Sequence, residues 1–338
     1  MKKITIVPIA VAFLLGVSAC TGSAQANTPA GEESTYDFDM SVTTSETSTW
    51  FKGAERFAEI VAEESDGRIT ISVFANDSLS AGDAVAGIEQ VMNGDKALSY
   101  NSAIQLSGID DRFSAIAAPF TFSNYDEVDS VLESAEAQDA YAGLTEEYGV
   151  KMLGFGENGM RQISNNTHEI DGPEDLKGLK IRVAGSKLFM DMYQTFGADP
   201  MVMSFAELFT SLQTGTVDGQ ENAVDLFYAN GLAEVQDYLT IMNYVYDPLL
   251  LMMNQEMFDA MSAEDQQIML DAAAEANEYQ IQLIRDLEQE QLVDIKEQME
   301  VKELSQSEIA EFREVLAPVY EKWIPVWTPE LYEAIQPK

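Results

Sequence analysis

The sequence predicts an α/β fold made of two domains. Three observations support this class: the length of the chain, a regular alternation of strand-like and helical segments, and one very long helical segment near the C-terminus. The chain has 338 residues, and at about 150 residues per domain this length favours two domains. Hydrophobic residues make up 46% of the chain, which is enough to build a core.

Short alternating or β-branched runs separate amphipathic segments through the first half of the chain. The expected order is a strand at 36–43, a helix at 48–64, a strand at 69–75, a helix at 81–93, a strand at 97–100, helices within 125–148 and a strand at 151–155. Such a βαβ order is typical of a sheet in which most strands pair in parallel.

The same alternation continues beyond residue 155. The pattern predicts a strand at 179–183, helices at 186–196 and 204–214, and two strand-like runs within 239–253. Asp247 and Pro248 separate the two runs, and proline is rarely found inside a strand, so we expect an interruption there.

A long helix is expected after these strands. Residues 263–317 contain neither Gly nor Pro, and Ser262 with Asp265 three residues later resembles a capping box at a helix start. An apolar stripe follows at Ala272, Ala276, Tyr279, Leu283 and Leu287. A helix of roughly 35 residues is about 50 Å long, which is enough to brace two domains.

The N-terminus has the pattern of an export signal. Lys2 and Lys3 precede an apolar run at 4–17, which is too short to span a bilayer and fits a secretory signal. Val17-Ser18-Ala19-Cys20 is similar to a bacterial lipobox, which predicts a lipoprotein signal peptide at 1–19, a lipid on Cys20 and a flexible tether at 20–35. An ordinary signal peptide cut after Ala24 or Ala26 is the alternative, and both predict export.

The charge of the chain excludes several classes of function. There are 58 acidic and 19 basic residues, for a formal net charge of −39. A surface this acidic repels phosphate backbones, so nucleic acid is not expected as a partner. The chain has one His and one Cys, which excludes a Cys/His zinc site and an intramolecular disulfide.

The sequence contains no convincing catalytic or cofactor-binding motif. Gly154-x-Gly156-x-x-Gly159 matches the dinucleotide fingerprint, but residues 160–165 have the pattern of a strand and Glu157 would repel a pyrophosphate. We therefore expect a glycine-rich strand crossover here. His168 lies in a turn-like segment, and no nucleophile elbow, P-loop, zinc-protease motif or EF-hand is present. No enzyme activity, cofactor or metal is expected.

Arginine is the residue type that points to a ligand. The chain has seven arginines: Arg56, Arg68, Arg112, Arg161, Arg182, Arg285 and Arg313. Arg182 lies near the end of the strand expected at 179–183, and ligands of open α/β sheets gather at the carboxyl ends of strands. A guanidinium there can bind a carboxylate through two parallel hydrogen bonds. From the residues alone, a structural salt bridge is the other interpretation.

Three motifs resemble one family. Residues 158–165, 172–183 and 203–222 are similar, in order and in spacing, to the solute-binding proteins of TRAP transporters, the DctP type. The resemblance extends from about residue 36 to the C-terminus. It implies a periplasmic-binding-protein-like (Venus flytrap) fold, with 36–158 plus 248–287 as domain I and 159–247 plus 288–338 as domain II. Such a monomeric receptor closes on an organic acid and delivers it to membrane permease subunits.

The resemblance also implies roles for individual residues. Arg182 matches the arginine that forms a salt bridge with the ligand carboxylate, and Arg161 matches a second arginine that faces the ligand. The other implied ligand-binding positions are Asn222, Phe205, Asn101 and Trp50, and side chains near Trp50, Asn101 and Tyr246 are expected to set the specificity. An acid sugar and a C4-dicarboxylate fit these residues equally well. The alternatives from other classes are a receptor for an ABC transporter or sensor, and an exported hydrolase of acid sugars.

Overall fold

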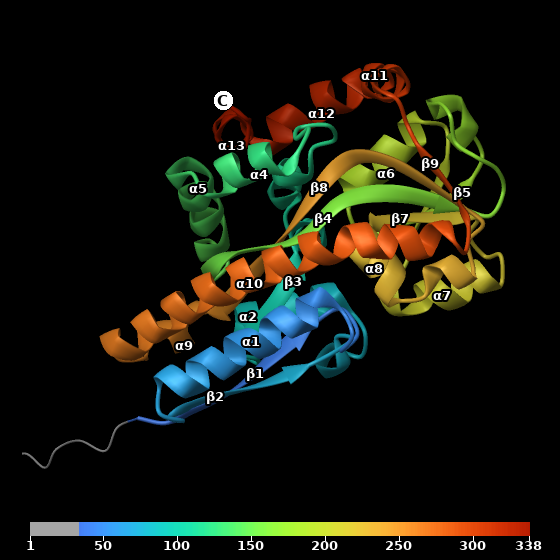
Figure 1. The fold of residues 1–338 in the computed structure, drawn as a ribbon. Coiled ribbons are helices and arrows are strands. Elements are labelled where there is room, and N and C mark those ends of the chain that lie inside the picture. The colour runs from blue at the N-terminus through green and yellow to red at the C-terminus, as the bar shows by residue number, and fades with distance from the viewer. Residues whose placement is uncertain (1–33) are drawn as a thin grey trace, which may run out of the picture. The chain divides into compact units, whose positions relative to one another are not determined.

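The computed structural model describes residues 34–338, so the expected signal peptide and the lipid attachment at Cys20 lie outside the described residues. The predicted α/β class is confirmed (Figure 1). The strands are β1 (Tyr36–Val42), β2 (Ile69–Phe74), β3 (Leu98–Ser102), β4 (Val150–Asn165), β5 (Lys180–Val183), β6 (Asp199–Val202), β7 (Gly219–Ala223), β8 (Tyr238–Asn254) and β9 (Glu300–Glu303).

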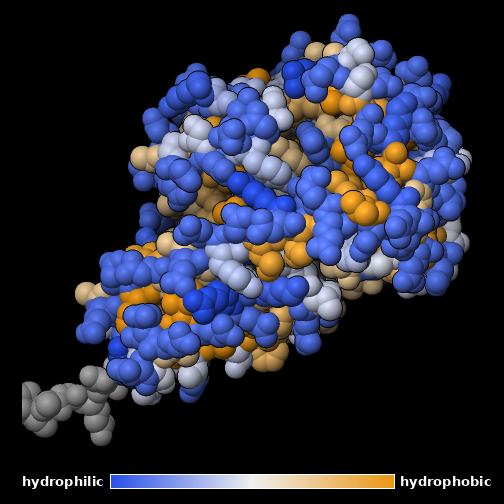
Figure 2. Space-filling model, viewed as in Figure 1, coloured by the Kyte–Doolittle hydropathy of each residue, from blue (hydrophilic) through white to orange (hydrophobic). Residues whose placement is uncertain are grey.

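Helices cover the sheet and fill the connections between its strands. They are α1 (Thr49–Glu64), α2 (Ala84–Asn93), α3 (Ala103–Leu106), α4 (Tyr125–Leu132), α5 (Ala135–Glu146), α6 (Lys187–Thr195), α7 (Phe205–Gln213), α8 (Val224–Ala229), α9 (Gln255–Asp259), α10 (Ala263–Lys296), α11 (Gln306–Val315), α12 (Ala317–Trp327) and α13 (Pro329–Ala334). Within residues 34–338, none of them combines the length and the apolarity that crossing a bilayer requires. Hydrophilic side chains cover most of the face shown in Figure 2, as the acidic composition leads one to expect.

The strands form one mixed sheet in the order β2-β1-β3-β8-β4-β7-β5-β6, with β9 paired to β8. The outer pairs β1–β2, β1–β3, β5–β6, β5–β7 and β8–β9 are parallel. The pairs β3–β8, β4–β7 and β4–β8 are antiparallel. The expectation of mostly parallel pairing is therefore right for the outer strands and wrong at the centre of the sheet.

The long strands β4 and β8 connect the two sides of the sheet. The end of β8 pairs with β3, whereas the end of β4 pairs with β7. The predicted interruption of β8 is wrong, because the strand runs through Asp247 and Pro248 without a break. Pro248 lies opposite Glu157, directly beside a shift in the register of the β4–β8 pair. The ladder is already irregular there, so the missing proline N–H is tolerated.

The glycine-rich segment is part of the continuous strand β4, so it is not a dinucleotide loop, and the expected crossover between two strands is wrong. Gly154 and Gly159 have φ angles of +149° and +98°, which side-chain-bearing residues rarely adopt. Both lie at register shifts between β4 and β8, so these glycines allow the strand to bulge. Two of the predicted domain boundaries, at 158/159 and 247/248, fall in this irregular region, and the third, at 287/288, falls within the helix at Ala263–Lys296; all three stay a prediction.

Helix α10 confirms the predicted long helix and contains 34 residues. It begins after Ser262, whose side chain accepts a hydrogen bond from the Asp265 N–H. The helix packs on α1, β4, α8 and β9, so it touches elements from both sides of the central strands (Figure 1).

The predicted apolar stripe of α10 is only partly right. Ala272 and Ala276 are buried, but Tyr279 is 43% exposed, and the buried face runs instead through Asn277 and Gln280. These two polar side chains are buried because they have partners. The Gln280 side chain donates to the carbonyl oxygen of Glu157 at 2.7 Å and accepts from its N–H at 2.8 Å. The Asn277 side chain accepts from the Tyr100 hydroxyl at 2.8 Å.

Gly53 allows α1 to approach α10 closely. A methyl group at this position would lie 2.7–2.8 Å from the Cβ and Cγ atoms of Gln280, closer than real contacts allow. Gly143, inside α5, provides a matched comparison because a methyl group there would meet nothing within 4 Å. Substitution of these two helical glycines by alanine therefore distinguishes the effect of close packing on stability from the effect of helix propensity.

We predict opposite effects for two Gly-to-Ala variants. Gly143→Ala raises the free energy of unfolding by about 0.5–1 kcal/mol, because alanine favours the helix. Gly53→Ala lowers it by about 1–3 kcal/mol, because the added methyl group overpacks the contact with Gln280. Urea unfolding followed by circular dichroism measures both values. A stabilised Gly53→Ala variant would contradict the close approach of α1 and α10.

Candidate functional site

A small cavity lies where β3, β4, β5, β7 and β8 meet the starts of α1 and α7. Its volume is about 30 Å³. The residues that line it are Thr43, Thr44, Trp50, Ser102, Ile104, Gln105, Asn158, Arg161, Arg182, Ala184, Phe205, Asn222, Leu226 and Asp247. Most of them are polar or charged, although several are almost completely buried. Buried polar groups gathered around a cavity are typical of a binding site for a small polar molecule.

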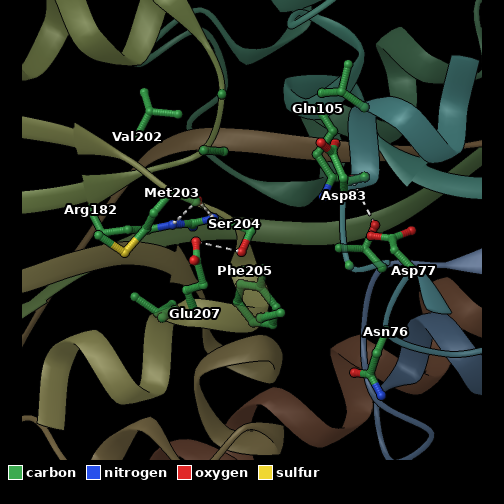
Figure 3. Close-up of a pocket in the computed structure, with 18 of the residues that line it drawn as sticks. Asn76, Asp77, Asp83, Gln105, Arg182, Val202, Met203, Ser204, Phe205 and Glu207 are labelled. Carbon is green, nitrogen blue, oxygen red and sulfur yellow. Dashed lines mark hydrogen bonds between the residues drawn. The ribbon is translucent and has the colours of Figure 1, made fainter. Parts of the chain in front are cut away.

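The cavity is continuous with a larger cleft of about 810 Å³. Thr43, Gln105, Arg182, Ala184 and Phe205 line both spaces, so the small cavity is the inner end of the cleft. In Figure 3, one wall of the cleft carries Arg182, Phe205 and Glu207, and the opposite wall carries Asn76, Asp77, Asp83 and Gln105.

The structure brings together five of the seven predicted site residues. Arg161, Arg182, Asn222, Phe205 and Trp50 line the inner cavity, and they come from β4, β5, β7, α7 and α1. These residues are far apart in the sequence, so the topology of the sheet gathers them.

The other two predicted residues do not line the cavity. Asn101 lies just behind the wall, where its side-chain amide donates to the Thr43 hydroxyl at 2.8 Å. The hydroxyl of Tyr246 donates to the Glu157 carboxylate at 3.1 Å, and its ring packs edge-on against Phe122. Asn101 is therefore placed to orient a lining residue, whereas Tyr246 supports the central strands.

Arg182 is a buried cation without a carboxylate partner. Only 4% of its surface is exposed, and its Nε and Nη2 atoms donate to the Met203 carbonyl oxygen at 3.2 and 3.0 Å. Among the described residues, no carboxylate forms an ion pair with it. Burial is the main cause that lowers the pKa of Arg182 to about 10; the charge of Glu221 opposes the change and that of Arg161 contributes to it. The guanidinium also lies 5.7 Å from the centre of the Phe205 ring.

Arg161 is equally buried but fully paired. Its Nε donates to the Glu221 carboxylate at 2.5 Å, and its Nη2 donates to the same carboxylate and to the Glu221 carbonyl oxygen, both at 2.9 Å. Its Nη1 donates to Asp247 at 2.8 Å. Burial alone would lower the pKa of Arg161, but the charges of Glu221 and Asp247 raise it above its ordinary value.

Asp247 is the centre of a second group of hydrogen bonds. Besides Arg161, it accepts from the Ser102 hydroxyl at 2.5 Å and from the Asn158 side-chain amide at 2.7 Å. The oxygen of that Asn158 amide accepts from the Trp50 indole at 3.3 Å. Burial raises the pKa values of both Asp247 and Glu221, which the positive charge of Arg161 opposes. This network fixes the wall of the cavity around Arg161.

Asn222 is the second group that lacks a partner. It is 3% exposed and lines the inner cavity, and its side-chain oxygen accepts no hydrogen bond within the described structure. An unsatisfied buried amide is costly, so it indicates a place where a ligand supplies the missing bonds. Arg182 therefore offers a charged donor to the cavity, and Asn222 offers an amide oxygen that can accept a hydrogen bond.

The sequence motifs did not identify several residues of the site. Glu221, Asp247, Ser102, Asn158 and Gln105 all belong to the networks around the cavity. With 58 acids in the chain, no pattern distinguishes the two buried carboxylates from the others. Two signals were available: Glu221 lies beside Asn222 inside the third motif, and Asn158 is the first residue of the first motif.

The outer cleft is acidic. Asp77 lies on its wall, where burial raises the pKa of its carboxyl group to about 6 although the Thr43 hydroxyl and the charge of Lys96 lower it. Asp83 and Glu207 also line the cleft.

No group of three or more possible metal ligands occurs within residues 34–338. The predicted turn residue His168 is half-buried, and its Nε2 contacts the Asp175 carbonyl oxygen at 2.9 Å, away from the cavity.

The chain matches the sequence profile of bacterial extracellular solute-binding protein family 7 over residues 40–325. It is 30% identical to the C4-dicarboxylate-binding protein DctB of Bacillus subtilis over 96% of this chain and 93% of that one. A TRAP periplasmic solute-binding protein from Ralstonia eutropha with bound (S)-2-acetolactate has a TM-score of 0.85 and 32% identity, covering 88% and 97% of the two chains. A sugar-acid-binding protein from Advenella mimigardefordensis in complex with galactonate has a TM-score of 0.85 and 30% identity, covering 90% and 97%.

These similarities confirm the predicted two-domain periplasmic-binding-protein fold. The relatives bind solutes and are not described as enzymes. The ligands named for these three proteins are a C4-dicarboxylate, a keto acid and a sugar acid. All three ligands have a carboxylate, and they differ in the rest of the molecule.

We predict that the two buried arginines differ in their effect on stability. Arg161→Met lowers the free energy of unfolding of the ligand-free protein by about 3–5 kcal/mol, because it leaves Glu221 and Asp247 buried without a cation. Arg182→Met leaves this free energy unchanged or raises it, because Arg182 is buried without a carboxylate partner. Denaturant unfolding of both variants tests the difference, and an equal loss in the two would contradict it.

Proposed function

This chain belongs to bacterial extracellular solute-binding protein family 7, the family of the TRAP transporter receptors, and we propose that it captures an organic acid by its carboxylate through Arg182. The observation that carries the proposal is the buried guanidinium of Arg182, which faces a cavity and has no carboxylate partner among the described residues. A ligand carboxylate supplies that partner, and a bidentate arginine fixes its orientation.

Asn222 and Phe205 complete the proposed carboxylate site. The Asn222 amide N–H can donate a neutral hydrogen bond to the same carboxylate, whereas its side-chain oxygen, which lacks a partner among the described residues, needs a donor such as a ligand hydroxyl. The Phe205 ring lies beside the Arg182 guanidinium and excludes water from the ion pair. Removal of water strengthens the interaction, because the effective dielectric constant of the site falls.

Capture of the ligand is proposed to involve movement of the cleft walls. The inner cavity of about 30 Å³ is large enough for water but far smaller than the roughly 300–1,000 Å³ typical of ligand pockets. A small organic acid needs more space, so it would occupy the junction of cavity and cleft, or the walls would separate to admit it. The irregular middle of β4 and β8, around Gly159 and Pro248, is the proposed hinge. A ligand that contacts both walls favours the closed arrangement.

The proposed partners follow from the family. After capture, the receptor would deliver the acid to the permease subunits of a TRAP transporter, and it would act as a monomer. Its proposed location is the periplasm or the cell surface, where a lipid on Cys20 would anchor it. The lipobox-like residues 17–20 support the anchor, and the absence of a spanning helix within residues 34–338 is compatible with it.

We predict that Cys20 determines how the exported protein is held. When the full-length chain is expressed in a bacterium that processes lipoproteins, the wild-type protein is found in the membrane fraction. Cys20→Ser moves it to the soluble fraction or stops its processing, because the lipid needs the thiol. Fractionation with mass spectrometry of the N-terminal peptide measures this. A soluble wild-type protein cleaved after Ala24 or Ala26 would contradict the anchor.

We predict that Arg182 dominates the affinity for the ligand. A thermal-shift screen over organic acids and mass spectrometry of the acid that co-purifies would identify a ligand, and a ligand at 100 times its Kd should stabilise the protein by about 2.7 kcal/mol. Arg182→Lys should then weaken binding roughly tenfold or more, because lysine cannot form the bidentate contact. Isothermal titration calorimetry measures the affinity.

Arg112 offers the matched control. It is a half-buried arginine that pairs with Asp110 and Glu147 and does not line the cleft. Arg112→Lys should leave the affinity unchanged. Unchanged affinity in Arg182→Lys would overturn the proposed site, and a screen in which no organic acid binds would overturn the proposed function.

A further inference from the structure

We infer that this receptor selects a hydroxylated monocarboxylate and discriminates against the corresponding dicarboxylate. The inference rests on the proposed function and adds the substrate class to it. It is carried by the way in which the charges of the inner cavity are already paired. The two arginines of the cavity would suggest two carboxylate sites if they were equivalent, but their surroundings differ.

The positive charge of Arg161 is neutralised by carboxylates of the protein itself. Glu221 and Asp247 both pair with it, and four hydrogen bonds occupy most of its donors. A guanidinium has five N–H groups, so a single N–H on Nη1 is left for a ligand. One N–H group can donate to a hydroxyl, but Arg161 has no positive charge to spare for a second carboxylate.

The four buried charges at the inner cavity balance when all are ionised. Arg161, Arg182 and Asp247 line the cavity, and Glu221 lies behind the wall, where it pairs with Arg161. A monocarboxylate brings the group to −1, with its charge placed directly on Arg182. A dicarboxylate brings it to −2 in a space largely closed to water, where unpaired charges are costly.

The outer cleft offers no alternative cation. Asp77, Asp83 and Glu207 line it, and among the described residues Arg182 is the one basic side chain on its walls. A second carboxylate that points outward from Arg182 therefore meets acids, just as one that points inward meets Asp247. Like charges brought together in a binding site are strongly unfavourable, which makes both orientations poor for a dianion.

The cavity does offer partners for hydroxyl groups. A carboxylate has about four lone-pair sites, and three of those of Asp247 are taken by Ser102, Asn158 and Arg161, so it can still accept one hydrogen bond. The Nε2 donor of Gln105 has no hydrogen-bond partner within the described residues and also faces the cavity. An acceptor beside a donor fits a ligand hydroxyl, which both donates and accepts.

Pairs of acids that differ at one end test the inference on the wild-type protein. Galactonate and galactarate differ by the exchange of a terminal CH₂OH for a carboxylate, and erythronate and meso-tartrate form the matching four-carbon pair. We expect calorimetry at neutral pH and moderate salt to give at least roughly tenfold weaker binding of the dicarboxylate in each pair that binds. Equal or tighter binding of the dicarboxylate overturns the inference and leaves the proposed function intact. Failure of all organic acids to bind at millimolar concentration overturns both.

Asp247→Asn tests the cause of the discrimination. The variant keeps the size of the side chain but makes the group of buried charges one unit more positive, while Glu221 stays paired with Arg161, so the preference for the monocarboxylate should fall roughly tenfold. Asp225→Asn is the control, because Asp225 is a buried carboxylate that accepts from Thr49 and Gln291 and does not line the cavity. The control should keep the wild-type preference. A preference that stays unchanged in Asp247→Asn overturns the charge argument, and the wild-type comparison decides the inference where the variant does not fold.

Discussion

The ion-pair network around Arg161 is the constraint on which the site depends. Its guanidinium joins Glu221 on β7 to Asp247 on β8, and Arg161 itself lies on β4, so one side chain connects the three adjacent strands. Asp247 extends the network to Ser102 and Asn158. These charges are buried, and removal of Arg161 would leave both carboxylates without their cation. The network thus fixes the geometry in which Arg182 meets the cavity.

The two buried arginines illustrate a division between structure and function. Arg161 has partners for nearly all of its donors, whereas Arg182 donates to a single carbonyl oxygen and has no carboxylate partner in the described chain. A protein selected for stability alone would not bury such a cation. Its retention makes sense where a ligand supplies the missing negative charge, since functional sites keep groups that destabilise the empty protein.

Much of the fold followed from local patterns, because these depend on residues close together in the chain. Periodicity predicted α1, α10 and most of the strands, and a resemblance in three motifs placed Arg182 and Asn222 in one site. The unbroken course of β8 through Pro248 could not be predicted, since it depends on a register shift in its partner strand. The role of Asp247 was equally hidden, because its partners come from two distant strands, β3 and β4.

The net charge of −39 affects how a ligand anion approaches this site. An acidic surface repels an organic anion at long range, and the acids of the outer cleft extend the repulsion up to Arg182. The repulsion grows with the charge of the ligand and is screened by salt. Affinity must therefore come from contacts at short range, where one desolvated guanidinium acts on one carboxylate. The surface and the cavity then act in the same direction, because each penalises a second negative charge on the ligand.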